Sequence, residues 1–530
     1  MRLTVGIGAR PAATPAEILA LLQESLPSLD DVVTVSTVDA RLDLARAVAA
    51  ERGWAVVGFG AEELADVSVP SPSTRVASAL GIPSVAEAAA LLAATRESHG
   101  GAAVLIVGKR ASPVATIAVA APAPEVTVVG IGADGHAGLS EAGRNAIDTA
   151  DVVFGGPRQL ALLPPRPAAA GRGEIGLDRA LTPRPDLVAW PSPLVPALPR
   201  LLAEQHGRRV CVLASGDPMH YGIGTTLVRL LGAGHVHAVP HPSSMALACA
   251  RLGWAQEDVD VVSAVGRSVD ALRRHLHDGR RILVLSSGAD TPAEVWRILE
   301  ESGFEASDVT VLEALGGGDE RVHRDPGAAR GLNIVAVECR GDGGLSVVPG
   351  LGDETYDSDG QLTKREIRAV TLAVLGPRPG ELLWDVGGGS GSIGIEWMRA
   401  HRSCRAVAVE RDPVRAERIR GNARRLGVPE LGVVVGAAPE ACDGLDAPDA
   451  VFVGGGFTAD GVFERCWDRL KPGGRLVVNA VTVESERLVG ELHARHGGEL
   501  TRLAVNRAAP VGGFLGWRPM LPVTQWVVRK

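Results

Sequence analysis

Several features that mark common protein classes are scarce in this 530-residue sequence. The six cysteines are scattered without a C-x-x-C pair, so neither a zinc site nor a disulfide framework is indicated. We expect them to be small buried hydrophobic residues in a reducing compartment. Aromatic residues make up 3% of the chain, and 54 basic residues face 62 acidic ones. This composition disfavours a nucleic-acid partner, which calls for a basic or aromatic docking surface.

Long apolar runs are also missing. No segment holds about 18 consecutive apolar residues, the length that spans a bilayer. The first ten residues, "MRLTVGIGAR", reach a glycine and an arginine before the apolar stretch of a signal peptide is built. We therefore expect a cytoplasmic protein without a membrane partner.

The length predicts three or four domains, at about 150 residues each. Two breaks divide the chain: the proline-rich segment Ala120–Glu125, which favours an extended linker, and the polar, glycine-rich segment Cys339–Gly360. Within each of the three pieces, Val/Ile/Leu-rich runs alternate with segments of helical periodicity, which is typical of α/β layers with largely parallel sheets. The predicted domains are 1–121, 125–345 and 349–530.

The stretch "LLWDVGGGSGSIGIEW" (Leu382–Trp397) predicts a strand, a glycine loop and a helix. Gly389, Gly391 and Gly394 satisfy the dinucleotide fingerprint G-x-G-x-x-G, and the same loop suits a methyl donor. Asp385 separates the two hypotheses, because a carboxylate beside the loop repels a pyrophosphate and attracts a cationic sulfonium. This charge favours S-adenosylmethionine.

The motifs that follow are those of a known fold. Glu410 ends the next strand, "RAVAVE", where a carboxylate can accept hydrogen bonds from ribose hydroxyls. With "DAVFVGGG" and "LKPGGRLVVNAVT", the segment resembles the class I S-adenosylmethionine-dependent methyltransferases, which have a Rossmann-like fold. With "TKREIRA" (Thr363–Ala369), it is most similar to the decarboxylating methyltransferase family of cobalamin synthesis.

The resemblance implies which residues bind the cofactor. In "GAAPE", Ala437 stands where the family usually has an acidic residue that meets the adenine amino group, so main-chain groups near Ala438 are expected to hold adenine. The implied cofactor-binding residues are Asp385, Gly387, Gly389, Gly391, Glu410 and Ala438.

The middle third carries a second set of motifs. "EVTVVGIGADG", "VCVLASGDPMHYG" and "VPHPSSM" resemble the tetrapyrrole methylase family, the class III methyltransferase fold, in which the donor lies between two α/β subdomains. "VVFGGPRQL" and "ARLGW" are similar to the branch that methylates a precorrin, although Val265 replaces a histidine found in many relatives. A second S-adenosylmethionine site is implied at Gly130, Gly132, Ser215, Asp217, Ser243 and Ser244.

A metal site is not expected in this third of the chain. The four histidines that gather in the sequence show no recognised ligand spacing. They are His220, His235, His237 and His241.

The N-terminal third, including "VGIGARPAATPAEILALLQESL" and "AAVLIVGKRASPVATIAVA", resembles the C-terminal domain of the cobalt-precorrin-5A hydrolase of cobalamin synthesis. The other half of that hydrolase is absent here, so hydrolysis is not implied. Lys109 and Arg110 either clamp carboxylates of a corrinoid or are exposed charges without a specific role.

Together the resemblances imply a three-domain α/β enzyme that methylates carbons 5 and 15 of precorrin-6, or its cobalt form, and decarboxylates an acetate side chain. Two S-adenosylmethionine sites and a homo-oligomer are expected, and the sequence names no catalytic acid or base. Asp353, Glu354 and Tyr356 precede the last domain, where they could line the mouth of the substrate site, but they are interpreted as solvated loop residues. The alternatives are an RNA or protein methyltransferase and a corrinoid carrier.

Overall fold

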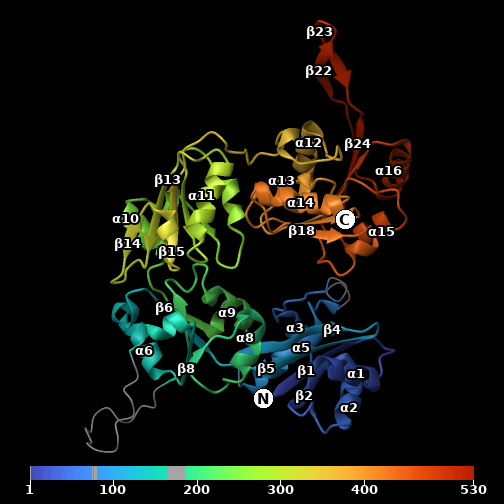
Figure 1. Ribbon diagram of the computed structural model, residues 1–530. Helices are drawn as coiled ribbons and strands as arrows, with labels where there is room; N and C mark the ends of the chain where they lie inside the picture. The colour runs from blue at the N-terminus through green and yellow to red at the C-terminus, as the bar shows by residue number, and fades with distance from the viewer. Residues whose placement is uncertain (1, 74–75, 77–79, 99, 165–184) are drawn as a thin grey trace, which may run out of the picture. The chain divides into compact units, whose positions relative to one another are not determined.

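The computed structural model describes residues 2–73, 76, 80–98, 100–164 and 185–530. The chain divides into two compact units. The first contains Met1–Arg251 and Ala314–Glu320, and the second contains Leu252–Glu313 and Arg321–Lys530. Both units consist of α/β layers, as the sequence predicted (Figure 1).

The first sheet of unit 1 has five strands in the order β3-β2-β1-β5-β4. Strands β1, β2 and β3 are parallel, whereas β5 runs antiparallel to both β1 and β4. Helix α5 packs against β1 so closely that a Cβ at Gly6 would lie 1.9 Å from the Ala86 carbonyl oxygen, so only glycine fits there. The elements are β1 (Leu3–Ala9), α1 (Pro15–Ser25), β2 (Val32–Val38), α2 (Leu42–Ala50), β3 (Ala55–Phe59), α3 (Ala61–Ala65), α5 (Val85–Glu97), β4 (Ala103–Ala111) and β5 (Ala115–Pro122).

The second sheet of unit 1 is parallel throughout, in the order β10-β6-β9-β7-β8. The carboxyl ends of its strands therefore meet at one edge. Its elements are β6 (Val126–Ile131), α6 (Glu141–Thr149), β7 (Val152–Gly155), α7 (Pro157–Ala161), β8 (Asp186–Ala189), α8 (Leu194–Ala203), β9 (Val210–Ser215), α9 (Ile223–Leu231), β10 (Val236–Val239) and α10 (Ser244–Leu252).

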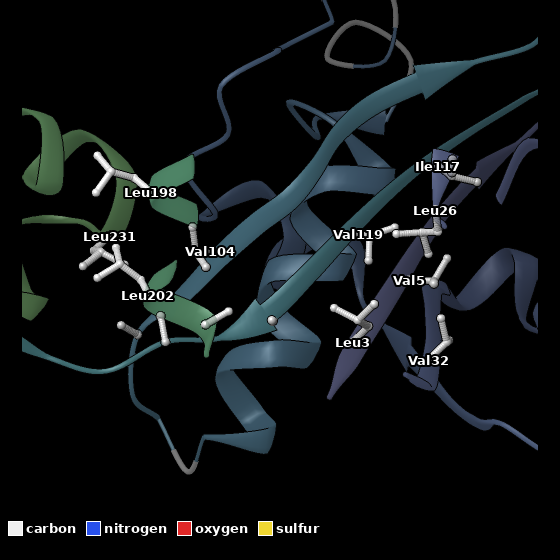
Figure 2. Close-up of a cluster of buried hydrophobic side chains, with 14 of the residues drawn as sticks. Leu3, Val5, Leu26, Val32, Val104, Ile117, Val119, Leu198, Leu202 and Leu231 are labelled. Atoms are coloured by element: carbon white, nitrogen blue, oxygen red, sulfur yellow. The ribbon is translucent and has the colours of Figure 1, made fainter. Parts of the chain in front are cut away.

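One hydrophobic core joins the two sheets of unit 1. Leu198 and Leu202 of α8 and Leu231 of α9 belong to the same buried cluster as Val104 of β4 (Figure 2). The segment predicted as a linker is extended, as expected, but residues 120–124 are buried, and Ala123 donates its N–H to the Ala102 carbonyl over 2.8 Å. No exposed linker separates the two sheets.

Unit 2 begins with a mixed sheet in the order β11-β12-β15-β13-β14, in which β11 and β12 are parallel and the other pairs antiparallel. Helix α11 accompanies it. The elements are β11 (Val259–Ser263), β12 (Arg281–Leu285), α11 (Thr291–Glu301), β13 (Asp308–Glu313), β14 (Arg321–His323) and β15 (Asn333–Glu338).

The last sheet has seven strands in the order β18-β17-β16-β19-β20-β24-β21. Strands β16 to β20 are parallel, and β24 is antiparallel to its neighbours. The chain builds the sheet outward in one direction from β16 to β18 and in the other direction from β19, and α/β sheets bind ligands at such a switch point. The strands expected after the glycine loop are all present. The elements are α12 (Arg365–Leu375), β16 (Leu382–Val386), α13 (Ser392–Ala400), β17 (Arg405–Glu410), α14 (Pro413–Arg425), β18 (Gly432–Val435), β19 (Ala450–Val453), α15 (Val462–Arg469), β20 (Arg475–Ala480), α16 (Val483–His496), β21 (Glu499–Leu503) and β24 (Val523–Arg529).

Strands β22 (Asn506–Val511) and β23 (Phe514–Pro519) form a separate two-stranded hairpin. The hairpin extends away from the seven-stranded sheet (Figure 1, red). None of the described helices has the length and apolar character needed to cross a bilayer.

Candidate active sites

The glycine loop after β16 depends on glycine at three positions. Gly387, Gly389 and Gly391 have φ angles of 75°, 59° and 78°, a region that side chains disfavour. A Cβ at Gly387 would lie 2.6 Å from the Gly455 carbonyl oxygen after β19, and one at Gly389 would lie 2.9 Å from that of Gln361. The loop is therefore a tight backbone cradle in contact with two other segments.

Glu410 closes this cradle from the neighbouring strand. Its Oε2 accepts the Gly389 N–H over 2.8 Å, and its Oε1 accepts the Asp412 N–H over 3.0 Å. The structure thus brings together the predicted residues of β16 and β17. Ala438 lies beyond β18, the next strand in the sheet, and is half-buried.

The structure buries Asp385 instead of presenting it at the mouth of the loop, as the sequence had suggested. The residue is 1% exposed, and its Oδ2 accepts the Gly394 N–H of α13 over 2.9 Å. Burial raises the pKa of this carboxyl to about 7; the hydrogen bond from Gly394 opposes the shift and the nearby Glu410 carboxylate adds to it. A contact between Asp385 and a sulfonium stays a prediction.

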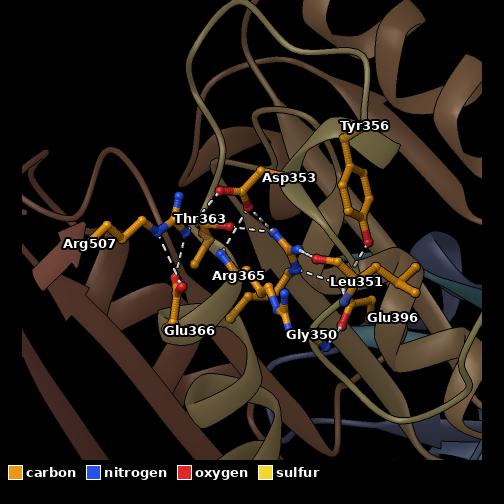
Figure 3. Close-up of polar contacts among 10 residues, drawn as sticks. Gly350, Leu351, Asp353, Tyr356, Thr363, Arg365, Glu366, Glu396 and Arg507 are labelled. Atoms are coloured by element: carbon orange, nitrogen blue, oxygen red, sulfur yellow. Dashed lines mark hydrogen bonds and ion pairs between the residues drawn. The ribbon is translucent and has the colours of Figure 1, made fainter. Parts of the chain in front are cut away.

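A buried ion pair supports the segment before the glycine loop (Figure 3). Arg368 of α12 donates Nε–H to Glu396 Oε1 of α13 over 2.6 Å, and both residues are buried. Glu396 also accepts the Tyr356 hydroxyl over 2.8 Å and the Gly350 N–H over 2.6 Å. The interpretation of Tyr356 as a solvated loop residue was wrong, because its ring is buried under the Arg368 guanidinium.

Asp353 connects this network to the hairpin. Its Oδ1 accepts the Arg365 N–H over 2.9 Å and lies 3.4 Å from Arg368 Nη1. Its Oδ2 lies 3.3 Å from Nη2 of Arg507 in β22, and the same guanidinium binds Glu366 over 2.5 Å and holds the pKa of that carboxyl below its usual range. Asp353 therefore anchors this segment through hydrogen bonds and ion pairs, whereas the sequence suggested a solvated residue. The motif "TKREIRA" had marked Arg368 and Glu366 only through the family resemblance.

The second glycine-rich edge lies in unit 1. The predicted residues lie in or just after the carboxyl ends of three adjacent strands, β10, β6 and β9, and the structure brings them to one edge. A Cβ at Gly130 would lie 2.1 Å from the Gly216 carbonyl oxygen, and one at Gly132 would lie 2.5 Å from Cε1 of His241. The backbones of the three strand ends therefore pack directly against one another.

The polar side chains of this edge hold its loops in place. Asp217 Oδ1 accepts the Met219 N–H over 2.7 Å, and Ser243 Oγ accepts the Ala246 N–H over 3.1 Å at the start of α10. Ser244 is the first residue of that helix. Ser215 Oγ accepts hydrogen bonds from Arg158 and Gln159.

The residues that sequence reasoning missed at this edge are Asp134 and His241. His241 Nε2 lies 3.3 Å from Asp134 Oδ2. The motif "GIGADG" contained Asp134, but only the fold shows that it meets His241, 107 residues away. Among the described residues no group of three His, Cys, Asp or Glu side chains is arranged to hold a metal ion.

The segment Ala314–Glu320 also reaches this edge, within unit 1. A Cβ at Gly317 would lie 2.9 Å from Cβ of Ala133, and Glu320 binds Arg251 through two hydrogen bonds. Val265, which replaces the histidine of many relatives, is exposed in unit 2.

Three family models match the chain. A model described as "Cobalamin synthesis G C-terminus" matches residues 3–120, "Tetrapyrrole (Corrin/Porphyrin) Methylases" matches 125–329, and "Precorrin methyltransferase domain" matches 354–530. These matches follow the order of the three resemblances found in the sequence.

Curated relatives agree with this order. A precorrin-6Y C(5,15)-methyltransferase [decarboxylating] of a Sinorhizobium species is 47% identical over 412 residues, covering 76% of this chain and 96% of the relative. A cobalt-precorrin-7 C(5)-methyltransferase of Salmonella typhimurium is 32% identical and covers 38% of this chain and 92% of its own. A probable cobalt-precorrin-6B C(15)-methyltransferase (decarboxylating) of Methanosarcina acetivorans is 31% identical and covers 33% and 98%.

The fold and the glycine-rich edges, with these matches, define an enzyme of the S-adenosylmethionine-dependent methyltransferase class. The chain belongs to the precorrin-6Y C(5,15)-methyltransferase (decarboxylating) family, which acts in cobalamin synthesis.

Proposed function

We propose that this enzyme methylates carbons 5 and 15 of precorrin-6 and removes carbon dioxide from an acetate side chain, with one S-adenosylmethionine site for each methyl group. The observation that carries the proposal is the presence of two glycine cradles in two different sheets, one after β6 and one after β16. The cobalt form of the substrate is the alternative, which direct competition between the two forms would test.

The two relatives with single activities suggest how the work is divided. One is named for carbon 5 and covers 38% of this chain, and the other is named for carbon 15 and decarboxylation and covers 33%. Their lengths fit the regions matched by the tetrapyrrole methylase and precorrin methyltransferase models. We assign carbon 5 to the edge after β6, and carbon 15 with decarboxylation to the edge after β16.

The residues at the C-terminal edge fit the methyl donor. The loop from Gly387 to Gly391 has no side chains at its three positive-φ positions, and Glu410, bonded to Gly389, is a carboxylate to which ribose hydroxyls can donate. When bound, S-adenosylmethionine supplies a methyl group to an electron-rich carbon. The half-buried backbone near Ala438 would hold adenine.

This chain's own contribution is mainly positioning. Methyl transfer needs the acceptor carbon in line with the methyl group, and alignment of this kind lowers the barrier by removing translational and rotational freedom. The Arg368–Glu396 pair fixes the segment before the loop through the N–H groups of Gly350 and Leu351. Decarboxylation at the same edge benefits from a dry, oriented carboxylate.

The edge in unit 1 fits a second donor for similar reasons. Gly130 and Gly132 bring the end of β6 against the ends of β9 and β10, so a ligand there meets main-chain groups of all three strands. Ser243 and Ser244 begin α10, whose first N–H groups suit a carboxylate.

The test is turnover by purified full-length enzyme. With S-adenosylmethionine labelled in the methyl group and precorrin-6, we expect two labelled methyl groups and one carbon dioxide per tetrapyrrole. Binding without turnover would favour the carrier hypothesis, and methylation of RNA or protein instead would contradict the proposal.

Two variants separate the sites. Glu410→Ala removes a predicted cofactor contact at the C-terminal edge, and we expect it to lose carbon-15 methylation first. Gly132→Ala places a methyl group 2.5 Å from the side chains of Asp134 and His241, so we expect carbon-5 methylation to fall. Loss of both methyl groups in either variant would contradict two independent sites.

We also propose that the enzyme assembles with copies of itself through the β22–β23 hairpin. Phe514 is 84% exposed and Trp517 is 77% exposed, and Val511 and Leu515 are exposed beside them. An isolated two-stranded hairpin is marginally stable in water, and apolar patches of this kind mark interaction sites. Between Arg507 and Arg518 the hairpin has no charged residue, which suits pairing with an identical hairpin.

Sedimentation of wild type and Trp517→Arg measures this assembly. An oligomer that dissociates in the variant supports the hairpin contact, and an unchanged oligomer or a wild-type monomer contradicts it. A cytoplasmic location is likewise a proposal, which cell fractionation tests.

A further inference from the structure

The environment of Arg158 differs from that of most other arginines in the described chain. It follows β7 and donates from Nη2 to Ser215 Oγ over 2.7 Å, and no carboxylate pairs with it among the described residues. Partial burial lowers the pKa of its guanidinium. Arg251, by contrast, binds Glu320 and has a raised pKa for that reason. A partly desolvated guanidinium without a carboxylate partner among the described residues is suited to bind an anion.

Ser215 fixes the direction of Arg158. Its hydroxyl accepts a second hydrogen bond from Gln159 Nε2 over 3.0 Å, so both acceptor positions of the oxygen are directed at α7. Arg158 and Ser215 are both exposed, and a ligand can therefore reach the donors of the guanidinium that Ser215 does not use.

The same edge carries a strained aromatic residue. Tyr221 has a φ of 56°, a conformation that is rare for a bulky side chain, and it follows Ser215 by six residues in the loop after β9. Its side chain is 41% exposed, and Met219 beside it is 44% exposed. Strain of this kind persists where the surroundings impose it, often at binding sites. The ring of Tyr221 packs edge-to-face with that of His220, 5.1 Å between centroids, and its exposed part is a candidate contact for a ligand at this edge.

Arg158 lies at the outer side of the predicted methyl-donor site, bonded to Ser215 at the end of β9. In the order β10-β6-β9-β7, Arg158 follows β7, whereas Gly130 and Gly132 lie at the end of β6. Two strand spacings, about 10 Å, lie between β6 and β7. Because Ser215 lies between Arg158 and these glycines, we expect a carboxylate at Arg158 to belong to a ligand that lies beside the methyl donor.

We propose that Arg158 binds a side-chain carboxylate of the tetrapyrrole and that Tyr221 packs on the face of its macrocycle. This inference rests on the proposed function, in which the edge after β6 methylates carbon 5. Ser215 is a positioning residue for Arg158. The ring of the substrate is apolar and conjugated, and its rim carries carboxylates. The guanidinium of Arg158 is suited to bind one of these carboxylates, and the aromatic ring of Tyr221 is suited to pack on the macrocycle.

The experiment compares Arg158→Gln, Arg158→Lys and wild type in the full-length enzyme. We expect the KM of carbon-5 methylation for the tetrapyrrole to rise by about 10- to 100-fold in Arg158→Gln, because hydrogen bonds to a charged group contribute this much. Arg158→Lys keeps the positive charge but lacks the planar guanidinium, so its KM should lie between those of wild type and Arg158→Gln. Carbon-15 methylation, followed by mass spectrometry and by NMR of labelled methyl groups, should be unchanged.

Arg200→Gln is the matched control. Arg200 lies in α8 of the same unit, exposed and paired with Glu204, and its replacement should leave the KM unchanged. Binding of S-adenosylhomocysteine, measured by calorimetry, should be the same in all variants. Weakened binding of this analogue in Arg158→Gln would overturn the proposal and assign the arginine to the methyl donor.

Tyr221→Gly provides a second, independent measurement. Glycine accepts the positive φ without strain, so we expect the backbone of the loop to be kept and the KM for carbon-5 methylation to rise. An unchanged KM in both Tyr221→Gly and Arg158→Gln would overturn the inference while wild-type turnover still upheld the proposed function. A wild-type enzyme that does not methylate the tetrapyrrole would overturn both.

Discussion

The Nε of Arg368 and the Oε1 of Glu396 lie 2.6 Å apart in the interior of unit 2, and neither side chain has appreciable exposure. Each remaining polar atom of the pair is directed at the segment before the glycine loop: Arg368 binds the Thr363 and Leu351 carbonyls, and Glu396 binds the Gly350 N–H. The pair therefore determines where the chain enters the C-terminal methyltransferase fold.

Breaking this pair should be costly. In Glu396→Gln the buried guanidinium keeps only the longer contact with Asp353, 3.4 Å away, and removal of one member of a buried pair typically costs about 3–5 kcal/mol. We expect the free energy of unfolding, measured in urea, to fall by this amount. Arg487→Ala, which removes a surface pair with Glu491, should change it by less than about 1 kcal/mol. Equal effects of the two variants would show that the buried pair has no special role.

Asp385 should make stability depend on pH. Because burial raises its pKa from 3.8 to about 7, the folded protein retains a proton that the unfolded chain releases between these values. The contribution of this carboxyl to the free energy of unfolding therefore decreases as pH rises through that window and is constant above it. Asp385→Asn lacks the titration, so its stability relative to wild type should increase with pH up to about 7. If the difference in free energy of unfolding between Asp385→Asn and wild type does not change with pH, the raised pKa of Asp385 is contradicted.

Gly387 should tolerate no side chain, and Gly380 is its matched control. Both have positive φ angles, 75° and 88°, so alanine strains each backbone by about 1 kcal/mol. Only at Gly387 does the added methyl group meet another backbone, that of Gly455 at 2.6 Å, whereas nothing lies within 4 Å at Gly380. Urea unfolding should show a larger loss for Gly387→Ala, and carbon-15 methylation should fall in that variant alone. Similar losses in both would mean that the close approach does not matter.

The cysteines should be unreactive until the protein unfolds. All six are free and buried, and desolvation raises the pKa of the Cys211 thiol to about 12. Titration with a thiol reagent should therefore give almost no reaction in the native enzyme and six equivalents in denaturant. Rapid reaction of one thiol in the native state would identify an opening of the fold near that residue.

The sequence predicted the parallel strands that flank the glycine loops well, because strand ends and glycine loops leave strong local signals. The expectation of largely parallel sheets was wrong for the sheet β11-β12-β15-β13-β14, in which three of the four strand pairs are antiparallel. The loop around Gly387 and the strand ending at Glu410 are visible in a few residues, and the family motifs placed them in order. Asp385 was placed less well: its charge was visible, but its burial depends on α13 packing across it. Local composition cannot report such packing.

The tertiary polar contacts were the least visible. Tyr356 and Asp353 lie in a glycine-rich stretch that resembles a solvated loop, and only their contacts with Glu396 and Arg365 show that the loop is anchored. The pairing of Asp134 with His241 likewise joins residues 107 positions apart. These contacts arise from the fold and have no sequence spacing of their own.

The shared core of unit 1 gives the N-terminal domain a structural role in addition to any binding role. Leu198, Leu202 and Leu231 belong to the methylase sheet but are buried in one cluster with Val104. Cutting the chain before β6 would leave those leucines facing water, and the remainder would be prone to aggregate. In this chain, therefore, the methylase sheet buries part of its apolar surface against the N-terminal sheet.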